Sequence, residues 1–141
     1  DNLFISAETG TGKTFLCNCI ARAILDSGYS VIYLSSVKLF DIIAGETFSN
    51  NREKERTDDI YSCDLLIIDD LGTEFANTFT LSAFFNCINE RLLSGRHTII
   101  STNLSLERLR EDYSERVFSR IAEKYKFIRL SGEILISAFL S

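Results

Sequence analysis

The stretch FISAETGTGKTFL, residues 4–16, decides the fold because it joins an apolar run to a glycine-rich loop and then to a helical pattern. It matches the phosphate-binding pattern G-x-x-x-x-G-K-[ST] except at the first position, where Ala7 stands in place of glycine. In such a loop, main-chain N–H groups at a helix N-terminus converge on phosphate. Lys13 would reach the β- and γ-phosphates of a nucleotide, and the Thr14 hydroxyl would bind Mg²⁺.

Ala7 is the one departure from the pattern, and it lies at the turn from strand to loop, farthest from the lysine. Alanine fits there at little cost if its φ is negative, whereas a positive φ adds strain of about 1 kcal/mol. A chance match is the alternative interpretation of the stretch. We expect a working loop with these nucleotide-binding residues: Glu8, Thr9, Gly10, Thr11, Gly12, Lys13, Thr14 and Phe15.

A second motif, LLIIDD at residues 65–70, supports the first. Four apolar residues predict a buried strand, and two carboxylates follow at its carboxyl end, where sites of α/β folds lie. Asp69 is predicted to hold Mg²⁺, and Asp70 is predicted to act as the general base that polarises the attacking water. A solvated acidic pair is the alternative, but loop and acidic strand end together predict a site for a nucleoside triphosphate.

Two weaker motifs follow. TIISTN ends at Asn103, whose amide would lie beside the γ-phosphate, although an asparagine after a strand is often a turn residue. In SERVFSRIAEK, Arg116 and Arg120 are four residues apart and share one helix face. That face is either solvated or carries an arginine finger, which reaches the nucleotide of a neighbouring subunit.

The remaining pattern predicts a single three-layer α/β domain over residues 1–141. Strands are expected at the continuous apolar runs 3–5, 31–34, 65–68, 98–100 and 127–130. Helical stripes lie between them, the first made of Leu16, Ile20, Ala23 and Ile24 and closed by Gly28. Further helices are expected over residues 81–92 and 117–121 and in both halves of the segment 36–62.

Composition narrows the function classes. A net charge of −5 and a pI of about 4.9 argue against a protein that coats duplex DNA non-specifically. The four cysteines lack zinc-site spacing and are expected to be reduced thiols, and His97 is interpreted as structural. No run of membrane-spanning length and no signal peptide is present, so we expect a cytoplasmic protein without a membrane partner.

The order TGTGKT, LLIIDDLGTE, STN and ERVFSRI resembles the AAA+ core of bacterial replicative helicase loaders of the DnaC/DnaI type. The helper ATPases of IstB-type transposition are similar. The resemblance covers residues 2–133 and implies a P-loop NTPase with a five-stranded parallel sheet in the order 5-1-4-3-2. It also implies that Asn103 is sensor 1 and that Arg120 is the finger, with Arg116 as second choice.

For function, the resemblance implies an ATP/ADP- and Mg²⁺-dependent protein that places the replicative DNA helicase on single-stranded DNA. The segment 36–62 would contact single-stranded DNA, with Arg52, Lys54 and Arg56 as candidates, although a solvated helix face remains open for them. Subunits would associate through the nucleotide interface. The helicase-binding region would precede this chain, and no C-terminal helical lid is expected within the chain. The last residues, 132–141, are apolar where members of this family usually have a charged ending.

Three other functions remain open. A transposition helper shares nearly the same core motifs. A nucleotide-gated binding module with little turnover is supported by Asp70, which is one methylene shorter than the usual glutamate. A P-loop small-molecule kinase is disfavoured because few arginines follow the acidic strand and because Asn103 suits a nucleotide switch better.

Overall fold

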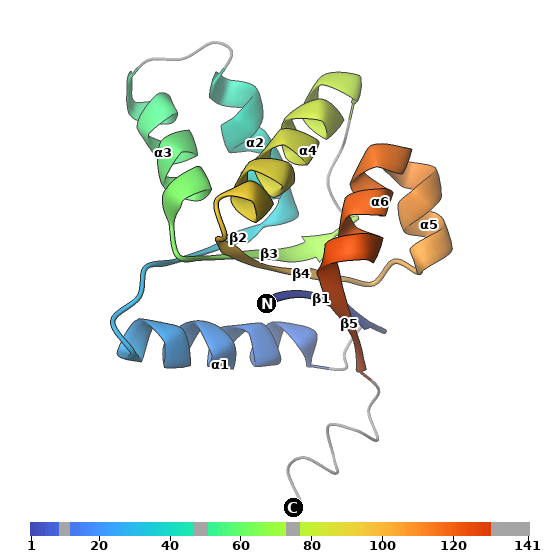
Figure 1. Cartoon of the computed structure of the whole chain (residues 1–141), viewed down its shortest axis with the longest axis horizontal. Helices are drawn as coiled ribbons and strands as arrows, with labels where there is room; N and C mark the ends of the chain where they lie inside the picture. Colours follow the sequence, from blue (N-terminus) through green and yellow to red (C-terminus); the bar gives the residue numbers. More distant parts are fainter. Residues whose placement is uncertain (9–11, 47–50, 73–76, 131–141) are drawn as a thin grey trace, which may run out of the picture.

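The computed structural model describes residues 1–8, 12–46, 51–72 and 77–130. Within them, one or two helices separate each strand from the next (Figure 1). The strands are β1 (Asn2–Ala7), β2 (Val31–Ser35), β3 (Leu65–Leu71), β4 (His97–Thr102) and β5 (Tyr125–Leu130). The helices are α1 (Lys13–Asp26), α2 (Ser36–Glu46), α3 (Asn51–Ser62), α4 (Thr78–Leu93), α5 (Leu106–Asp112) and α6 (Glu115–Lys124).

The five strands form one parallel sheet in the order β2-β3-β4-β1-β5. Read from the other edge, this is 5-1-4-3-2, which confirms the predicted order. Because all strands run the same way, their carboxyl ends meet at one edge of the sheet, where ligands bind in such folds.

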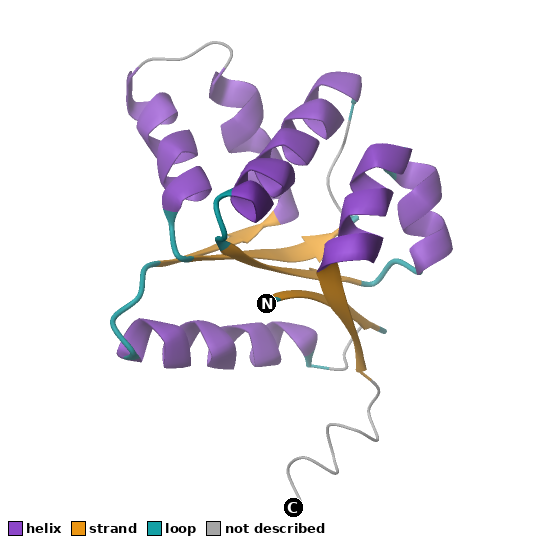
Figure 2. Cartoon of the chain, viewed as in Figure 1, coloured by secondary structure: helices purple, strands orange, loops and turns teal. Residues whose placement is uncertain are grey.

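Helices cover both faces of the sheet (Figure 2). Of the described helices, α1 alone lies on one face, while α2, α3, α4 and α6 lie on the other (Figure 1). Successive side chains of β3 point to opposite faces of the sheet and so contribute to the core on both sides. Leu65 and Ile67 pack in the core beneath α1, and Leu66 and Ile68 pack in the core of the opposite face. The continuous apolar runs are therefore explained by a sheet that is buried on both sides.

The buried face of α1 is centred on other residues than the predicted stripe, whose members Leu16, Ile20 and Ile24 are only partly buried. Cys17 and Ala21 are its buried apolar residues, while the predicted member Ala23 is exposed. The helical period explains the error, since residues 17 and 21 are four apart and share a face that residue 23 does not. Gly28 follows the C-cap residue with a φ of +91°, as the glycine predicts.

The helix α5 was not predicted, because seven residues are too few to show a helical period. It begins at the N-cap Ser105, whose hydroxyl accepts a hydrogen bond from the main-chain N–H of Arg108. Both helices expected within residues 36–62 are present as α2 and α3. All four cysteines are free thiols, as expected, and Cys19 is exposed.

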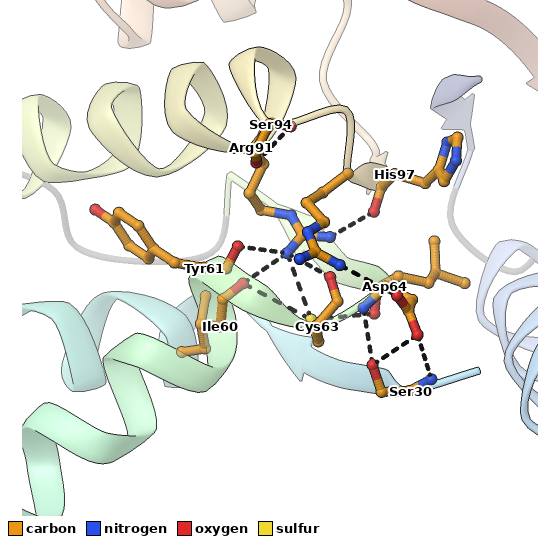
Figure 3. Close-up of polar contacts among 10 residues, drawn as sticks. Ser30, Ile60, Tyr61, Cys63, Asp64, Arg91, Ser94 and His97 are labelled. Atoms are coloured by element: carbon orange, nitrogen blue, oxygen red, sulfur yellow. Dashed lines mark hydrogen bonds and ion pairs between the residues drawn. The ribbon is translucent and has the colours of Figure 1, made fainter. Parts of the chain in front are cut away.

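A fully buried arginine ties three elements together at the amino edge of the sheet (Figure 3). Arg91 of α4 is 0% exposed. Its guanidinium donates to the main-chain oxygens of Ile60 (2.8 Å) and Cys63 (2.9 Å), at the end of α3 and just beyond it. It also donates to the main-chain oxygen of His97 (2.7 Å) and to the Thr98 hydroxyl (3.0 Å), at the start of β4. Arg91 therefore fixes the end of α3 against α4 and β4.

No helix in the part of the chain that the structure describes is long and apolar enough to span a bilayer.

Candidate functional site

The described residues that flank the predicted loop are the end of β1 and the start of α1, at the carboxyl edge of the sheet. Gly12 precedes α1 with a φ of +87°, a conformation that favours glycine. Ala7 is the last residue of β1 and pairs with Leu130. Among the described residues other than glycine, only Asp70 has a positive φ, so alanine fits at position 7 without strain. Thr9, Gly10 and Thr11 lie outside the described residues.

The first two residues of α1 contact the two acidic residues of β3. The Thr14 hydroxyl donates to Asp69 Oδ2 at 3.1 Å. The Lys13 ammonium lies 3.5 Å from Asp70 Oδ1, and Lys13 is only 8% exposed. Four residues that the sequence singled out from two distant motifs are therefore in direct contact.

Hydroxyl groups surround the Asp69 carboxylate. Ser101 of β4 donates to Oδ1, and the Tyr33 hydroxyl of β2 donates to Oδ2 at 2.7 Å. Burial alone would raise the pKa of Asp69, but these bonds, the bond from Thr14 and the charge of Lys13 hold it below its usual range. Asp69 is therefore ionised at neutral pH and suited to a cation.

The backbone at Asp70 is held in a left-handed conformation, with a φ of +61°. Its N–H donates to Ser101 Oγ at 3.0 Å, and its carbonyl accepts from Ser36 Oγ at 2.9 Å. The pairing of β3 with β4 shifts register between Ile68 and Leu71, as at a β-bulge. Bulges of this kind redirect side chains beside functional sites, and here the Asp70 side chain meets Lys13.

Asn103 immediately follows β4, which lies between β3 and β1 in the sheet. It is exposed at the edge where Lys13 and the acidic pair lie. The hydroxyl of Thr102 donates to the main-chain oxygen of Leu71 at 2.5 Å and so holds the ends of β4 and β3 together. Asn103 therefore lies at the same edge of the sheet as Lys13 and the acidic pair, and its place beside a γ-phosphate stays a prediction.

The two arginines of the motif SERVFSRIAEK lie elsewhere. α6 packs against α4, α5 and β5, on the opposite face of the sheet from α1 (Figure 1). The Arg116 guanidinium stacks over the Phe85 ring, 4.1 Å from its centroid. With Arg120 and Asn89, these residues line a surface depression of about 510 Å³. The structure thus places Arg116 and Arg120 around one depression on the face of the sheet opposite α1.

Other predicted residues have less defined surroundings. Glu8 is exposed at the end of β1, and Phe15 is exposed in the first turn of α1. Arg56 lines a depression between α2, α3 and β2 together with Lys38. The side chains of Arg52 and Lys54 lie outside the described part of the structure.

The sequence interpretation missed Tyr33, Ser101 and Ser36 as parts of the site. Each is a hydroxyl residue within an apolar strand run or one or two residues after it, which is the one signal that could have singled them out. Their contacts depend on the pairing of β2, β3 and β4, which the residue order alone does not reveal.

Comparison with known proteins agrees with this geometry. The family model described as IstB-like ATP binding protein matches residues 1–121. The replicative helicase loader DnaC of Escherichia coli (strain K12) is 27% identical over 122 residues, which are 85% of this chain and 49% of DnaC. The chromosomal replication initiator protein DnaA of Campylobacter fetus is 30% identical over 122 residues, 84% of this chain and 27% of DnaA. The chain spans about half the length of the helicase loaders it matches.

Solved structures share the fold. A replication initiator DnaA bound to AMPPCP and single-stranded DNA superposes with a TM-score of 0.81 at 25% identity, over 93% of this chain and 40% of that one. The DnaC helicase loader superposes with a TM-score of 0.76 at 23% identity, over 93% of this chain and 78% of that one. Both likenesses support the arrangement of sheet and helices described above.

Proposed function

This chain belongs to the IstB-like ATP-binding protein family, and on that premise we propose that it is a slowly hydrolysing AAA+ ATPase of the helicase-loader type. One observation carries the proposal. The loop residues Lys13 and Thr14 contact the acidic residues Asp70 and Asp69 at the carboxyl edge of the sheet. This pairing of a phosphate-binding lysine and hydroxyl with two carboxylates suits a nucleoside triphosphate with Mg²⁺.

The residues present fit both groups. Lys13 is a nearly buried cation whose partner Asp70 could be exchanged for phosphate oxygens. Thr14 and Asp69 would hold Mg²⁺, which commonly binds through one or two carboxylates together with substrate phosphates and water. No cluster of three or more His, Cys, Asp or Glu side chains that could hold a metal ion is found among the described residues, so phosphates would have to complete the site. When bound, Mg²⁺ neutralises charge on the β- and γ-phosphates.

We assign roles in hydrolysis to Asp70 and Asn103, which lie at the same edge of the sheet as Lys13. Asp70 would accept a proton from the attacking water after Lys13 turns to phosphate, and Asn103 would orient the terminal phosphate. Because aspartate is one methylene shorter than glutamate, Asp70 would reach the water less well. We therefore expect slow hydrolysis without a partner. Binding of ATP without any measurable phosphate release would favour the nucleotide-gated binding module instead.

Arg120 would act on the nucleotide of a neighbouring subunit, because α6 lies on the opposite face of the sheet from α1. Arg120→Ala is expected to leave ATP binding intact and to lower DNA- or partner-stimulated hydrolysis by about 10³-fold. Equilibrium binding of a fluorescent ATP analogue and steady-state phosphate release measure the two effects.

The matched control is Arg108→Ala, which removes an exposed arginine of α5 that is paired with Asp112. We expect wild-type hydrolysis from it. Arg116→Ala tests the second candidate for the arginine finger. The Arg116 guanidinium already stacks over the Phe85 ring. Equal loss of binding and hydrolysis in Arg120→Ala would contradict a finger role for this residue.

For partners, we propose the replicative helicase, bound through a region outside this chain, single-stranded DNA and further copies of the protein. The DnaC relative is named as a replicative helicase loader, and a DnaA neighbour was solved with single-stranded DNA. Arg52, Lys54 and Arg56 on α3 are the candidate DNA contacts. A transposition helper is the second candidate function, favoured by the family description itself.

A further inference from the structure

Tyr33 lies where a residue of the edge strand β2 can reach the acidic end of β3. It packs against the apolar cluster beneath α1, on the same face as Leu65 and Ile67. In the parallel register, Tyr33 is level with Ile67, and Ser35 is level with Asp69. The Tyr33 side chain therefore extends along the strand direction by about two residues, so that its hydroxyl contacts Asp69.

The contact is specific to the hydroxyl group. Tyr33 donates to Asp69 Oδ2 at 2.7 Å, and Thr14 donates to the same oxygen at 3.1 Å. Ser101 donates to the other oxygen. Donors from β2, β4 and α1 thus fix the plane of one carboxylate. A phenylalanine at position 33 would supply the same ring for packing but would leave the carboxylate without the donor from β2.

We infer that Tyr33 is a positioning residue whose hydroxyl holds the Asp69 carboxylate in the orientation that Mg²⁺ binding with the nucleotide requires. This inference rests on the proposed function of the site. Groups that hydrogen-bond metal ligands orient them, and removing such a group commonly costs 10–100-fold in metal affinity. The edge strand β2, which carries none of the sequence motifs, thereby becomes part of the nucleotide site.

The test is Tyr33→Phe in the full-length protein, with binding rather than turnover as the readout. A fluorescent ATP analogue is titrated with Mg²⁺ at fixed nucleotide, and nucleotide affinity is measured separately in EDTA. We expect the apparent Mg²⁺ affinity to fall about tenfold. The nucleotide affinity in EDTA and the thermal midpoint should remain those of the wild type.

Tyr29→Phe is the matched control, because Tyr29 is an exposed tyrosine in the loop before β2. It should behave as the wild type in both titrations. Unchanged Mg²⁺ affinity in Tyr33→Phe would overturn the inference. Equal losses with and without Mg²⁺, or loss of the fold, would overturn it too, since the hydroxyl would then be merely structural. A wild-type protein that binds no Mg²⁺-nucleotide would instead overturn the proposed function.

Discussion

Lys13→Ala is expected to lower the affinity for ATP about 100-fold, which corresponds to about 2.7 kcal/mol of binding free energy. The Lys13 ammonium would form charge-assisted hydrogen bonds with phosphate oxygens. Because Lys13 is only 8% exposed, water screens this charge little. Titration of a fluorescent ATP analogue in the presence of Mg²⁺ measures the effect.

The fold should survive this substitution. The Asp70 side chain that loses its partner is 41% exposed, and truncation of the Lys13 side chain leaves space for water at the buried Oδ1, so the charge can be solvated. We expect the free energy of unfolding to change by less than about 1 kcal/mol. Lys124→Ala, at an exposed lysine beside Glu123, is the control and should bind ATP as the wild type does. Wild-type affinity in Lys13→Ala would contradict the assignment of the loop.

Arg91→Ala is expected to have the largest effect on stability, lowering the free energy of unfolding by about 3–5 kcal/mol. The substitution removes the hydrogen bonds that Arg91 donates to the main-chain oxygens of Ile60, Cys63 and His97 (Figure 3). It also leaves a cavity at the amino edge of the sheet. Buried acceptors without partners cost about 1–3 kcal/mol each when water cannot reach them. Urea denaturation measures the change.

Arg96→Ala is the matched control, three residues beyond the end of α4. Its side chain is 39% exposed and forms one ion pair with Asp64, at 3.2 Å. Such surface pairs contribute at most about 1 kcal/mol. If Arg91→Ala and Arg96→Ala lose similar amounts of stability, the interpretation of Arg91 as the anchor of α3 is wrong.

Much of the fold could be predicted because its signals are local. Continuous apolar runs marked all five strands within a few residues of their ends, since both faces of the sheet are covered. The order of the strands came from the resemblance rather than from local pattern, because order depends on where each crossover helix packs. α5 was missed because only Leu109 is buried in it, and one buried residue makes no period.

The site was predictable only in part, for a similar reason. Lys13, Thr14, Asp69 and Asp70 carry motif chemistry at fixed spacing, so sequence alone could name them. Tyr33 and Ser101 act through the pairing of strands distant in sequence. A hydroxyl in a strand is also a common residue without special chemistry.

Arg91 was overlooked because it occupies a core position that is usually apolar. It lies one heptad after Phe84, on the buried side of α4. A charged residue at such a position indicates a buried hydrogen-bond network, but apart from the Thr98 hydroxyl the oxygens that accept from Arg91 belong to the main chain, which leaves no mark in the sequence.

The most direct test of the proposed function is complex formation with the replicative helicase of the same organism. The full-length protein and the helicase are mixed with and without ATP and Mg²⁺, and size-exclusion chromatography reports whether they co-elute. Our proposal predicts a co-eluting complex whose formation or release depends on ATP. The absence of a complex under every nucleotide condition would contradict the helicase-loader function and would make the transposition helper the leading candidate.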